Sequence, residues 1–266
     1  MMKLTEPQIQ AFHKTGYHIF GGLLTEVEAE RMVQIYMNCL TNHQANHTSQ
    51  SVQILRQNED ESSLDGAYYQ LRCAHLMHPD FDAIIRNERL LDAVESLIGP
   101  NLRIVICQGL YKPPYTGGEI DWHQDDYYFR VNKPNAVISC WLTFDDATVD
   151  NGCMWVIPGA HKRMVEHEIV SSGKGFHIPN ADESKAIPIE LERGHCMLHH
   201  GLMPHRTLAN TTASHRRALA IHYMDAAARP SASRMQEPPE NMPLVRGKGI
   251  EWNVNEWSYQ WVEING

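Results

Sequence analysis

The chain carries the run Ile120-Asp121-Trp122-His123-Gln124-Asp125 near its middle, and His205 follows about eighty residues later. In an extended segment, side chains two positions apart point to the same face, so His123 and Asp125 can bind one metal ion while Gln124 faces elsewhere. Two imidazoles and one carboxylate on one face of a ferrous ion leave three adjacent positions for a bidentate oxoacid and dioxygen. The run therefore predicts an oxygenase-type iron site whose third ligand comes from another strand.

This spacing is not specific by itself. With 16 histidines and 32 acidic residues in 266 positions, a carboxylate two places after a histidine is expected about twice by chance. The chain contains a second case, His78-Pro79-Asp80. Asp80 stands just before an apolar-periodic run that starts at Phe81, so we interpret it as a helix N-cap and not as a metal ligand.

The wider sequence resembles the phytanoyl-CoA dioxygenase family, whose members are Fe(II)- and 2-oxoglutarate-dependent oxygenases. The resemblance extends from Leu4 to about Tyr223. It rests on segments in the family's order: Leu110 to Asp125, the strand around Trp141, Asn151-Gly152-Cys153 leading to Ile157-Pro158-Gly159-Ala160-His161, and His205 to Asn210 followed by Arg216. It implies a mainly β protein with a helical buttress, built on a cupin-like double-stranded β-helix (jelly roll) whose open mouth holds the iron.

The residues alone leave several histidines open as the third ligand, namely His195, His199, His200, His205 and His215. The resemblance assigns His205, because Asn210 and Arg216 follow it at the family's offsets of five and eleven positions. The implied metal ligands, which are also the catalytic residues, are therefore His123, Asp125 and His205. Related halogenases carry a small residue in place of this carboxylate, so Asp125 favours hydroxylation.

Arg216 is expected to bind the C5 carboxylate of 2-oxoglutarate, since a planar guanidinium offers two parallel N–H bonds to a carboxylate. Arg217 is its rival, and on a strand the two side chains point to opposite faces. Thr207 lies where the family usually has a serine that touches the cosubstrate, although an ordinary turn hydroxyl is the alternative.

Three further residues are expected at or near the cosubstrate pocket. Gln124 and Trp141 lie at the family's offsets from the first histidine, and Trp141 could equally be core packing. Lys112 could supply positive charge near the mouth or be simply solvated.

Two segments are expected to select a small-molecule substrate. Tyr127, Tyr128 and Arg130, in the run that follows the metal motif, could contact the substrate or seal the barrel rim. The polar segment 41–66 lacks apolar periodicity, and a loop of this length in a compact domain favours a substrate lid over plain disorder.

The order of elements favours one catalytic domain over residues 1–266, with a mostly helical part (1–100), a jelly-roll core (101–225) and a C-terminal extension (226–266). Capping boxes at Thr5 and Thr25 predict two helices, ending near Gly16 and Leu40, with a strand at 17–20 between them. A third helix is predicted over 81–98. Short apolar runs separated by turn residues predict strands at 102–107, 136–144, 154–157, 186–191, 196–199 and 218–224.

Composition excludes several classes of protein. The net charge of −9 argues against a nucleic-acid surface, which needs clustered Lys and Arg. The six cysteines show no Cys-x-x-Cys spacing and are expected to be reduced, and neither a signal region nor a membrane-length apolar run is present, which predicts a cytoplasmic protein. The sequence does not specify an oligomeric state. A zinc hydrolase with the same ligands leaves Arg216 unexplained, and a non-catalytic metal-bearing module would retain a full catalytic set for no purpose.

Overall fold

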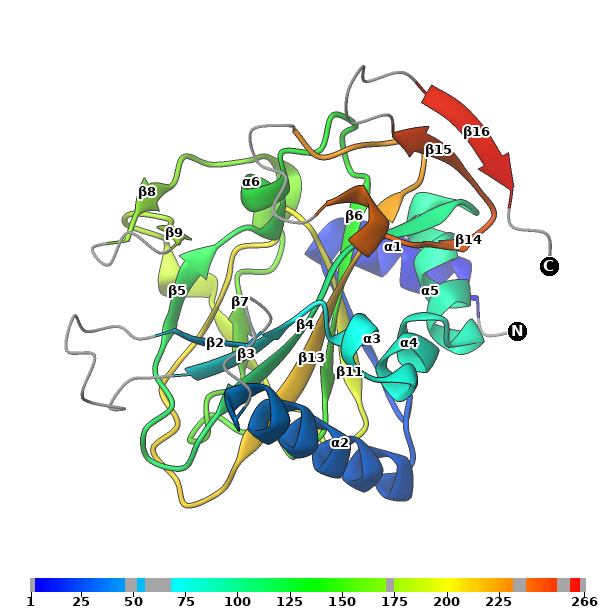
Figure 1. Ribbon diagram of the computed structural model, residues 1–266. Helices are drawn as coiled ribbons and strands as arrows, with labels where there is room; N and C mark the ends of the chain where they lie inside the picture. Colours follow the sequence, from blue (N-terminus) through cyan, green and yellow to red (C-terminus); the bar gives the residue numbers. More distant parts are fainter. Residues whose placement is uncertain are drawn as a thin grey trace.

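The computed structural model describes residues 3–45, 52–55, 68–170, 175–231, 238–252 and 259–263. Two antiparallel sheets face each other, and helices cover the outer face of the larger sheet (Figure 1). The helices are α1 (Glu6–Thr15), α2 (Glu26–Ala45), α3 (Ala74–Met77), α4 (Pro79–Ile85), α5 (Glu88–Ile98) and α6 (Asp125–Phe129). This arrangement is the jelly roll with a helical buttress that the family resemblance implies.

The larger sheet has eight strands in the order β1-β11-β6-β13-β4-β3-β2, with β14 also paired to β4. Its strands are β1 (Tyr17–Phe20), β2 (Val52–Leu55), β3 (Tyr68–Arg72), β4 (Leu102–Lys112), β6 (Val137–Thr143), β11 (Cys196–His200), β13 (Arg216–Asp225) and β14 (Leu244–Arg246). The smaller sheet has the order β10-β7-β12-β5. Its strands are β5 (Ile120–His123), β7 (Met154–Val156), β10 (Ile187–Ile189) and β12 (His205–Thr207). Two hairpins complete the strands: β8 (Glu168–Ile169) with β9 (Phe176–His177), and β15 (Lys248–Trp252) with β16 (Tyr259–Glu263).

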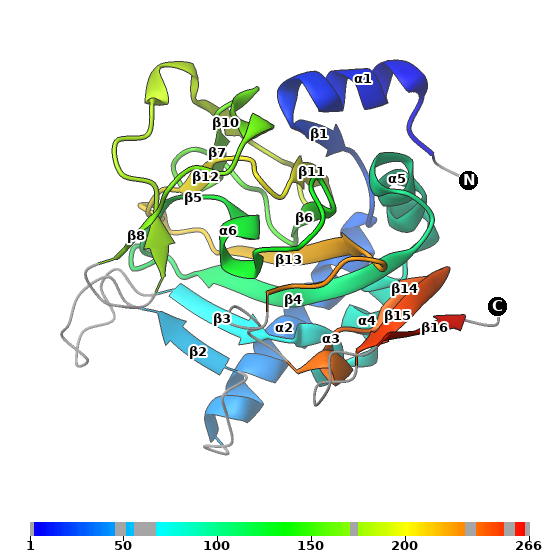
Figure 2. The same cartoon turned by 90° about the horizontal axis from the view of Figure 1, so that it is seen from above.

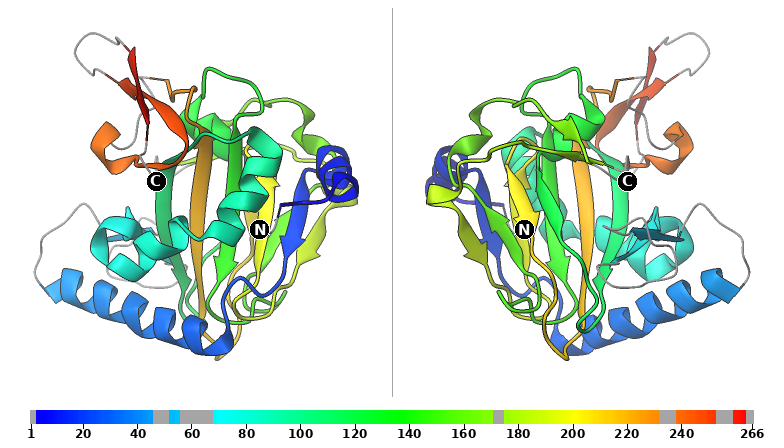
Figure 3. Two further views of the ribbon diagram at one scale, coloured as in Figure 1. Left: turned by 90° about the vertical axis from the view of Figure 1, so that its right-hand side faces the viewer. Right: turned by 90° about the vertical axis from the view of Figure 1, so that its left-hand side faces the viewer.

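Strand β13 shows how the large sheet separates the core from the site. Leu219, Ile221 and Tyr223 belong to the apolar core that includes the helices, and the Tyr223 hydroxyl donates to the Ile85 carbonyl of α4 at 3.1 Å. Figures 2 and 3 show α2, α4 and α5 on this side of the sheet and the small sheet on the other. Because side chains alternate along a strand, Ala220 and His222 face the space between the two sheets instead.

The two capping boxes are present. The Thr5 amide donates to Gln8 Oε1 at 2.9 Å, and the Thr25 amide donates to Glu28 Oε2 at 2.8 Å. Gly16 closes α1 in the left-handed region, at φ 86°, as the sequence predicts. The second helix runs beyond the predicted end at Leu40 and reaches Ala45.

Two predictions about the helices after residue 78 are wrong. The single helix predicted over 81–98 is two helices, because the Asn87 side chain accepts from the amides of Arg89 and Leu90 and starts α5 there. The N-cap of α4 is His78, whose Nδ1 accepts from the Asp80 amide at 3.1 Å. Asp80 lies inside the first turn, and its carboxylate pairs with Arg31 at 2.6 Å.

All six predicted strands of the core are present, and the first of them continues to Lys112. The apolar runs did not predict β5 and β12, which carry the metal motif and His205; only the metal motif pointed to an extended segment at His123 and to a second strand for the third ligand. Most of the predicted 41–66 lid lies outside the described residues, and its described parts are the end of α2 and the strand β2. Within the part of the chain that the structure describes, no helix combines the length and hydropathy of a membrane span.

Candidate active site

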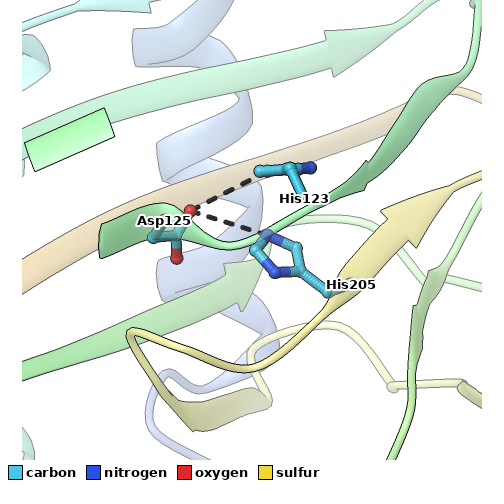
Figure 4. A group of neighbouring side chains, drawn as sticks. All are labelled: His123, Asp125 and His205. Atoms are coloured by element: carbon cyan, nitrogen blue, oxygen red, sulfur yellow. Dashed lines mark ion pairs between the residues drawn. The ribbon is translucent and has the colours of Figure 1, made fainter. Parts of the chain in front are cut away.

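The three predicted metal ligands meet at one edge of the small sheet, where β5 ends and β12 begins. His123 is the last residue of β5, and it is the register partner of His205, the first residue of β12. Asp125 follows at the start of α6, and its Oδ1 lies 3.8 Å from His123 Nε2 and 3.6 Å from His205 Nε2 (Figure 4). The three candidate ligand atoms all lie within 4.8 Å of one another, so they could hold one metal ion.

Backbone hydrogen bonds set which imidazole nitrogen faces this point. His123 Nδ1 lies 2.7 Å from the Asp121 carbonyl, and His205 Nδ1 lies 2.9 Å from the Met203 carbonyl. A carbonyl only accepts, so each Nδ1 carries the proton and each Nε2 keeps a lone pair for a metal.

The surroundings of His123 and Asp125 keep both side chains in the form that binds a cation. Burial, with a smaller contribution from His205, lowers the pKa of His123 to about 3. Burial alone would raise the pKa of Asp125, but His222, His205 and His199 around it hold that pKa well below its usual range. At neutral pH the site therefore offers the neutral imidazole of His123 and the ionised carboxylate of Asp125.

The ligands open into a cavity of about 640 Å³ between the sheets, which Arg216, Thr207 and Trp141 also line. Arg216 is 1% exposed, and none of its three guanidinium nitrogens has a hydrogen-bond partner among the described residues. Trp141 Nε1 and Thr207 Oγ1 are likewise buried and unpartnered in the described part of the chain. Because a buried cation normally has a hydrogen-bonded partner, this cluster fits an anionic ligand such as a carboxylate.

Arg217 points to the opposite face, as its position on the strand predicts. Its Nε and Nη2 each donate to a different oxygen of Asp145, both at 2.7 Å. Arg217 is thus already paired, whereas Arg216 faces the cavity.

Comparison with known proteins agrees with this architecture. The family model "Phytanoyl-CoA dioxygenase (PhyH)" matches residues 12–218. The chain belongs to the phytanoyl-CoA dioxygenase family. Among curated relatives, phytanoyl-CoA dioxygenase domain-containing protein 1 of Mus musculus is 30% identical over 168 residues, which are 59% of this chain and 57% of the mouse protein. The Danio rerio protein of the same name is 24% identical over 84% of this chain and 91% of its own length. The match thus spans a little over half of the mouse relative.

Solved structures share the fold over most of the chain. The non-heme monooxygenase ThoJ is 25% identical with a TM-score of 0.71, over 90% of this chain and 84% of its own. The alpha-ketoglutarate-dependent carbocyclase SnoK is 23% identical with a TM-score of 0.74, over 91% and 96%. The epimerase SnoN, solved with Fe3+, alpha ketoglutarate and nogalamycin RO, is 20% identical with a TM-score of 0.71, over 91% and 98%. At these identities SnoK and SnoN show the jelly-roll fold alone.

Two residues expected to contact the cosubstrate lie outside the cavity lining of this family member. The Gln124 amide donates to the carbonyls of Arg163 at 2.9 Å and Leu202 at 2.7 Å, and its oxygen accepts from the Val165 amide at 2.9 Å. Its side chain is therefore occupied in holding two loops.

Lys112 is fully buried and not at the mouth. Its ammonium donates to the carbonyls of Gly118 and Leu208. Burial lowers the pKa of Lys112 well below its usual range, with Arg216 adding to the effect. The expectation of a solvated lysine is wrong, because its partners are backbone carbonyls, one six residues along the chain at Gly118 and one in the remote segment at Leu208.

Only one of the three expected substrate contacts lines the cavity. Tyr128 lies there, with Phe129, whereas the Tyr127 ring stacks on His167 at 3.9 Å and the Arg130 guanidinium lies 4.1 Å from the Tyr127 ring centroid. The sequence was interpreted as extended, but Asp125 to Phe129 form a helical turn. Positions i, i+3 and i+4 of a helix share one face, so Asp125, Tyr128 and Phe129 face the cavity.

The sequence missed two residues beside Asp125, Ser139 and His222. His199, an alternative ligand at the outset, lies with them, and its Nε2 is 3.7 Å from Asp125 Oδ2. Strand alternation could have identified His222, because it lies six positions after Arg216 and therefore on the same face of β13.

Proposed function

We propose that this chain is an Fe(II)- and 2-oxoglutarate-dependent dioxygenase that hydroxylates a C–H bond of a small molecule and releases succinate and CO2. Arg216 is the observation that supports this most directly. It is a fully buried cation without a partner among the described residues, and it lines the same cavity as a His-Asp-His cluster. A dicarboxylic oxoacid has one end to chelate a metal and another to pair with a guanidinium, which matches both features.

In this proposal His123, Asp125 and His205 hold Fe(II), while Arg216 and Thr207 bind the distal carboxylate of 2-oxoglutarate. Trp141 lies beside them, with its ring centroid 5.8 Å from the Arg216 guanidinium carbon. The iron and the oxoacid, when bound, would supply the oxidising chemistry that activates dioxygen and removes a hydrogen atom from the substrate. The chain orients both partners and keeps water away.

Tyr128 and Phe129 on α6 supply that exclusion on the side of the metal ligands. The Tyr128 hydroxyl accepts from the Phe176 amide at 2.9 Å, which fixes the ring edge-on to His123, with centroids 5.9 Å apart. An aromatic wall at this point shields the reacting centre and leaves the rest of the cavity for the substrate.

The alternatives differ in what they leave unexplained. A zinc hydrolase with the same three ligands has no role for Arg216. A non-catalytic module would bind metal and oxoacid without turnover. The solved relatives are named monooxygenase, carbocyclase and epimerase. The reaction that follows removal of the substrate hydrogen must therefore be identified by product analysis. The carboxylate of Asp125 supports hydroxylation.

The test is an incubation with Fe(II), 2-oxoglutarate and ¹⁸O2, with succinate and labelled product measured in parallel. We expect succinate with Fe(II) and none with Zn(II), and we expect Arg216→Ala to need a far higher concentration of 2-oxoglutarate for the same rate of succinate formation. With a prime substrate, one ¹⁸O atom should enter the product. Hydrolysis supported by Zn(II), or oxoacid binding that never yields succinate, would contradict the proposal.

A further inference from the structure

The two oxygens of the Asp125 carboxylate have different surroundings. Oδ1 is the atom that faces both histidine ligands, as the dashed lines in Figure 4 mark. Oδ2 points the other way and accepts a hydrogen bond from Ser139 Oγ at 2.6 Å. His222 Nδ1 lies 3.4 Å from the same oxygen. One oxygen is thus free for a metal while the other is held by the large sheet.

The large sheet supplies these groups as one row. Ser139 on β6 is the register partner of His222 on β13 and of His199 on β11. All three side chains are buried, at 1%, 3% and 2% exposure, and each has a polar atom within 3.7 Å of Oδ2 of Asp125, the first residue of α6. Their spacing is set by strand pairing, so the row is a rigid support.

The directions of the hydrogen bonds follow from the groups involved. A carboxylate only accepts, so Ser139 uses its single proton on Asp125. Its oxygen can then only accept from His222 Nδ1, which lies 2.8 Å away. The His222 ring therefore carries a proton on Nδ1, and the donors run in one direction, from His222 to Ser139 to Asp125. Such a chain strengthens each of its bonds.

We propose that Ser139 and His222 are positioning residues that keep Asp125 a one-oxygen metal ligand. The inference rests on the proposed function. A six-coordinate iron with three protein atoms leaves three positions, two for the oxoacid and one for dioxygen. If Oδ2 lost its donors, the carboxylate could turn and chelate the metal with both oxygens. It would then occupy a position that the oxoacid needs.

The test compares variants of the full chain under anaerobic conditions. Fe(II) affinity is measured first, and 2-oxoglutarate is then titrated into the iron form while its charge-transfer absorption is recorded. Ser139→Ala and His222→Leu remove the donors, whereas His222→Asn keeps an N–H near the position of Nδ1. Thr143→Val is the matched control, since it deletes a buried hydroxyl of the same strand that donates to the carbonyls of Glu192 and His195.

We expect Ser139→Ala and His222→Leu to bind Fe(II) but to lose oxoacid affinity by about tenfold to a hundredfold, the size of loss in metal affinity or activity that follows removal of a partner of a metal ligand. The intensity of the charge-transfer band at a given 2-oxoglutarate concentration should decrease together with the oxoacid affinity. His222→Asn and Thr143→Val should behave like the parent. Unchanged oxoacid affinity in the first two variants would overturn the proposal, and so would an equal loss in Thr143→Val or a loss confined to Fe(II) binding. A parent chain that binds neither Fe(II) nor 2-oxoglutarate would instead contradict the proposed function.

Discussion

Replacing Arg216 by methionine separates binding of the oxoacid from stability of the fold. Methionine has a comparable length without charge, and the three guanidinium nitrogens it removes have no partner among the described residues. Loss of a buried, charged hydrogen-bond partner costs about 2–5 kcal/mol of binding free energy. The dissociation constant of 2-oxoglutarate should therefore rise about thirtyfold or more.

The same substitution should stabilise the ligand-free protein. Burial lowers the pKa of Arg216 to about 10, so the folded state disfavours the charged form relative to the unfolded chain. A base with a lowered pKa in the folded state destabilises the fold at every pH below that pKa, and the penalty disappears as the pH rises through it. The size of this shift corresponds to about 3 kcal/mol. We expect Arg216→Met to recover part of this penalty.

Thermal melting with and without 2-oxoglutarate, in the presence of Mn(II), measures both effects. Ligand at a hundred times its dissociation constant stabilises the parent by about 2.7 kcal/mol, which is about 5–10 °C for a chain of this size. Arg216→Met should melt higher without ligand, and at the same ligand concentration it should gain at most about 0.9 kcal/mol, or about 2–3 °C. Arg217→Ala is the matched control, because it breaks the pair with Asp145 and should melt lower yet keep the shift. A shift of parental size in Arg216→Met would refute the reasoning.

Three further predictions follow from the site. Asp125→Ala removes one of three ligands and should abolish succinate formation, and an anaerobic Fe(II) titration that found parental affinity would speak against the assignment. Tyr128→Ala should raise the KM of the prime substrate, whereas Tyr127→Ala should mainly lower the melting temperature. Steady-state kinetics and melting curves of both variants check this. The reverse ranking would contradict the placement of Tyr128, and not Tyr127, on the face of α6 that lines the cavity. Burial lowers the pKa of His123 to about 3, of His199 to about 3 and of His200 to about 4, and raises that of Asp126 to about 7. Between pH 4 and 6, His123, His199 and His200 are protonated in the unfolded chain but not in the folded protein. Asp126 is protonated in the folded protein but not in the unfolded chain. The unfolded chain therefore binds more protons than the folded protein. The metal-free protein should therefore lose stability as the pH falls from 6 to 4, and a flat pH profile in urea unfolding would contradict this.

Apolar composition predicts the strands of the core but not those of the site. The runs that became β6, β11 and β13 are rich in apolar and β-branched residues because one of their faces packs on the helices. Strands β5 and β12 are three or four residues long and contain histidine, aspartate and arginine. The surrounding sheet determines how these two strands pair, and the local sequence pattern contains no information about that sheet.

The helical errors have a similar origin. The apolar period of 81–98 continues across Arg86 and Asn87, so periodicity alone cannot detect that Asn87 caps a new helix. Lys112 is a harder case. Its burial depends on carbonyls at Gly118 and Leu208, and the second of these is remote in sequence. Nothing near Lys112 in the chain indicates that such partners exist.

The metal motif itself shows why a correct ligand prediction can rest on incomplete geometry. His123 and Asp125 do converge, but β5 ends between them and Asp125 opens a helical turn. That turn rotates Tyr127 and Arg130 away from the cavity and brings Tyr128 toward it. Gln124, at the junction, uses its whole amide to tie this turn to the neighbouring loops. Replacing Gln124 should therefore disturb the metal ligands through the position of α6, and the direct loss of a cosubstrate contact is not needed to explain such an effect.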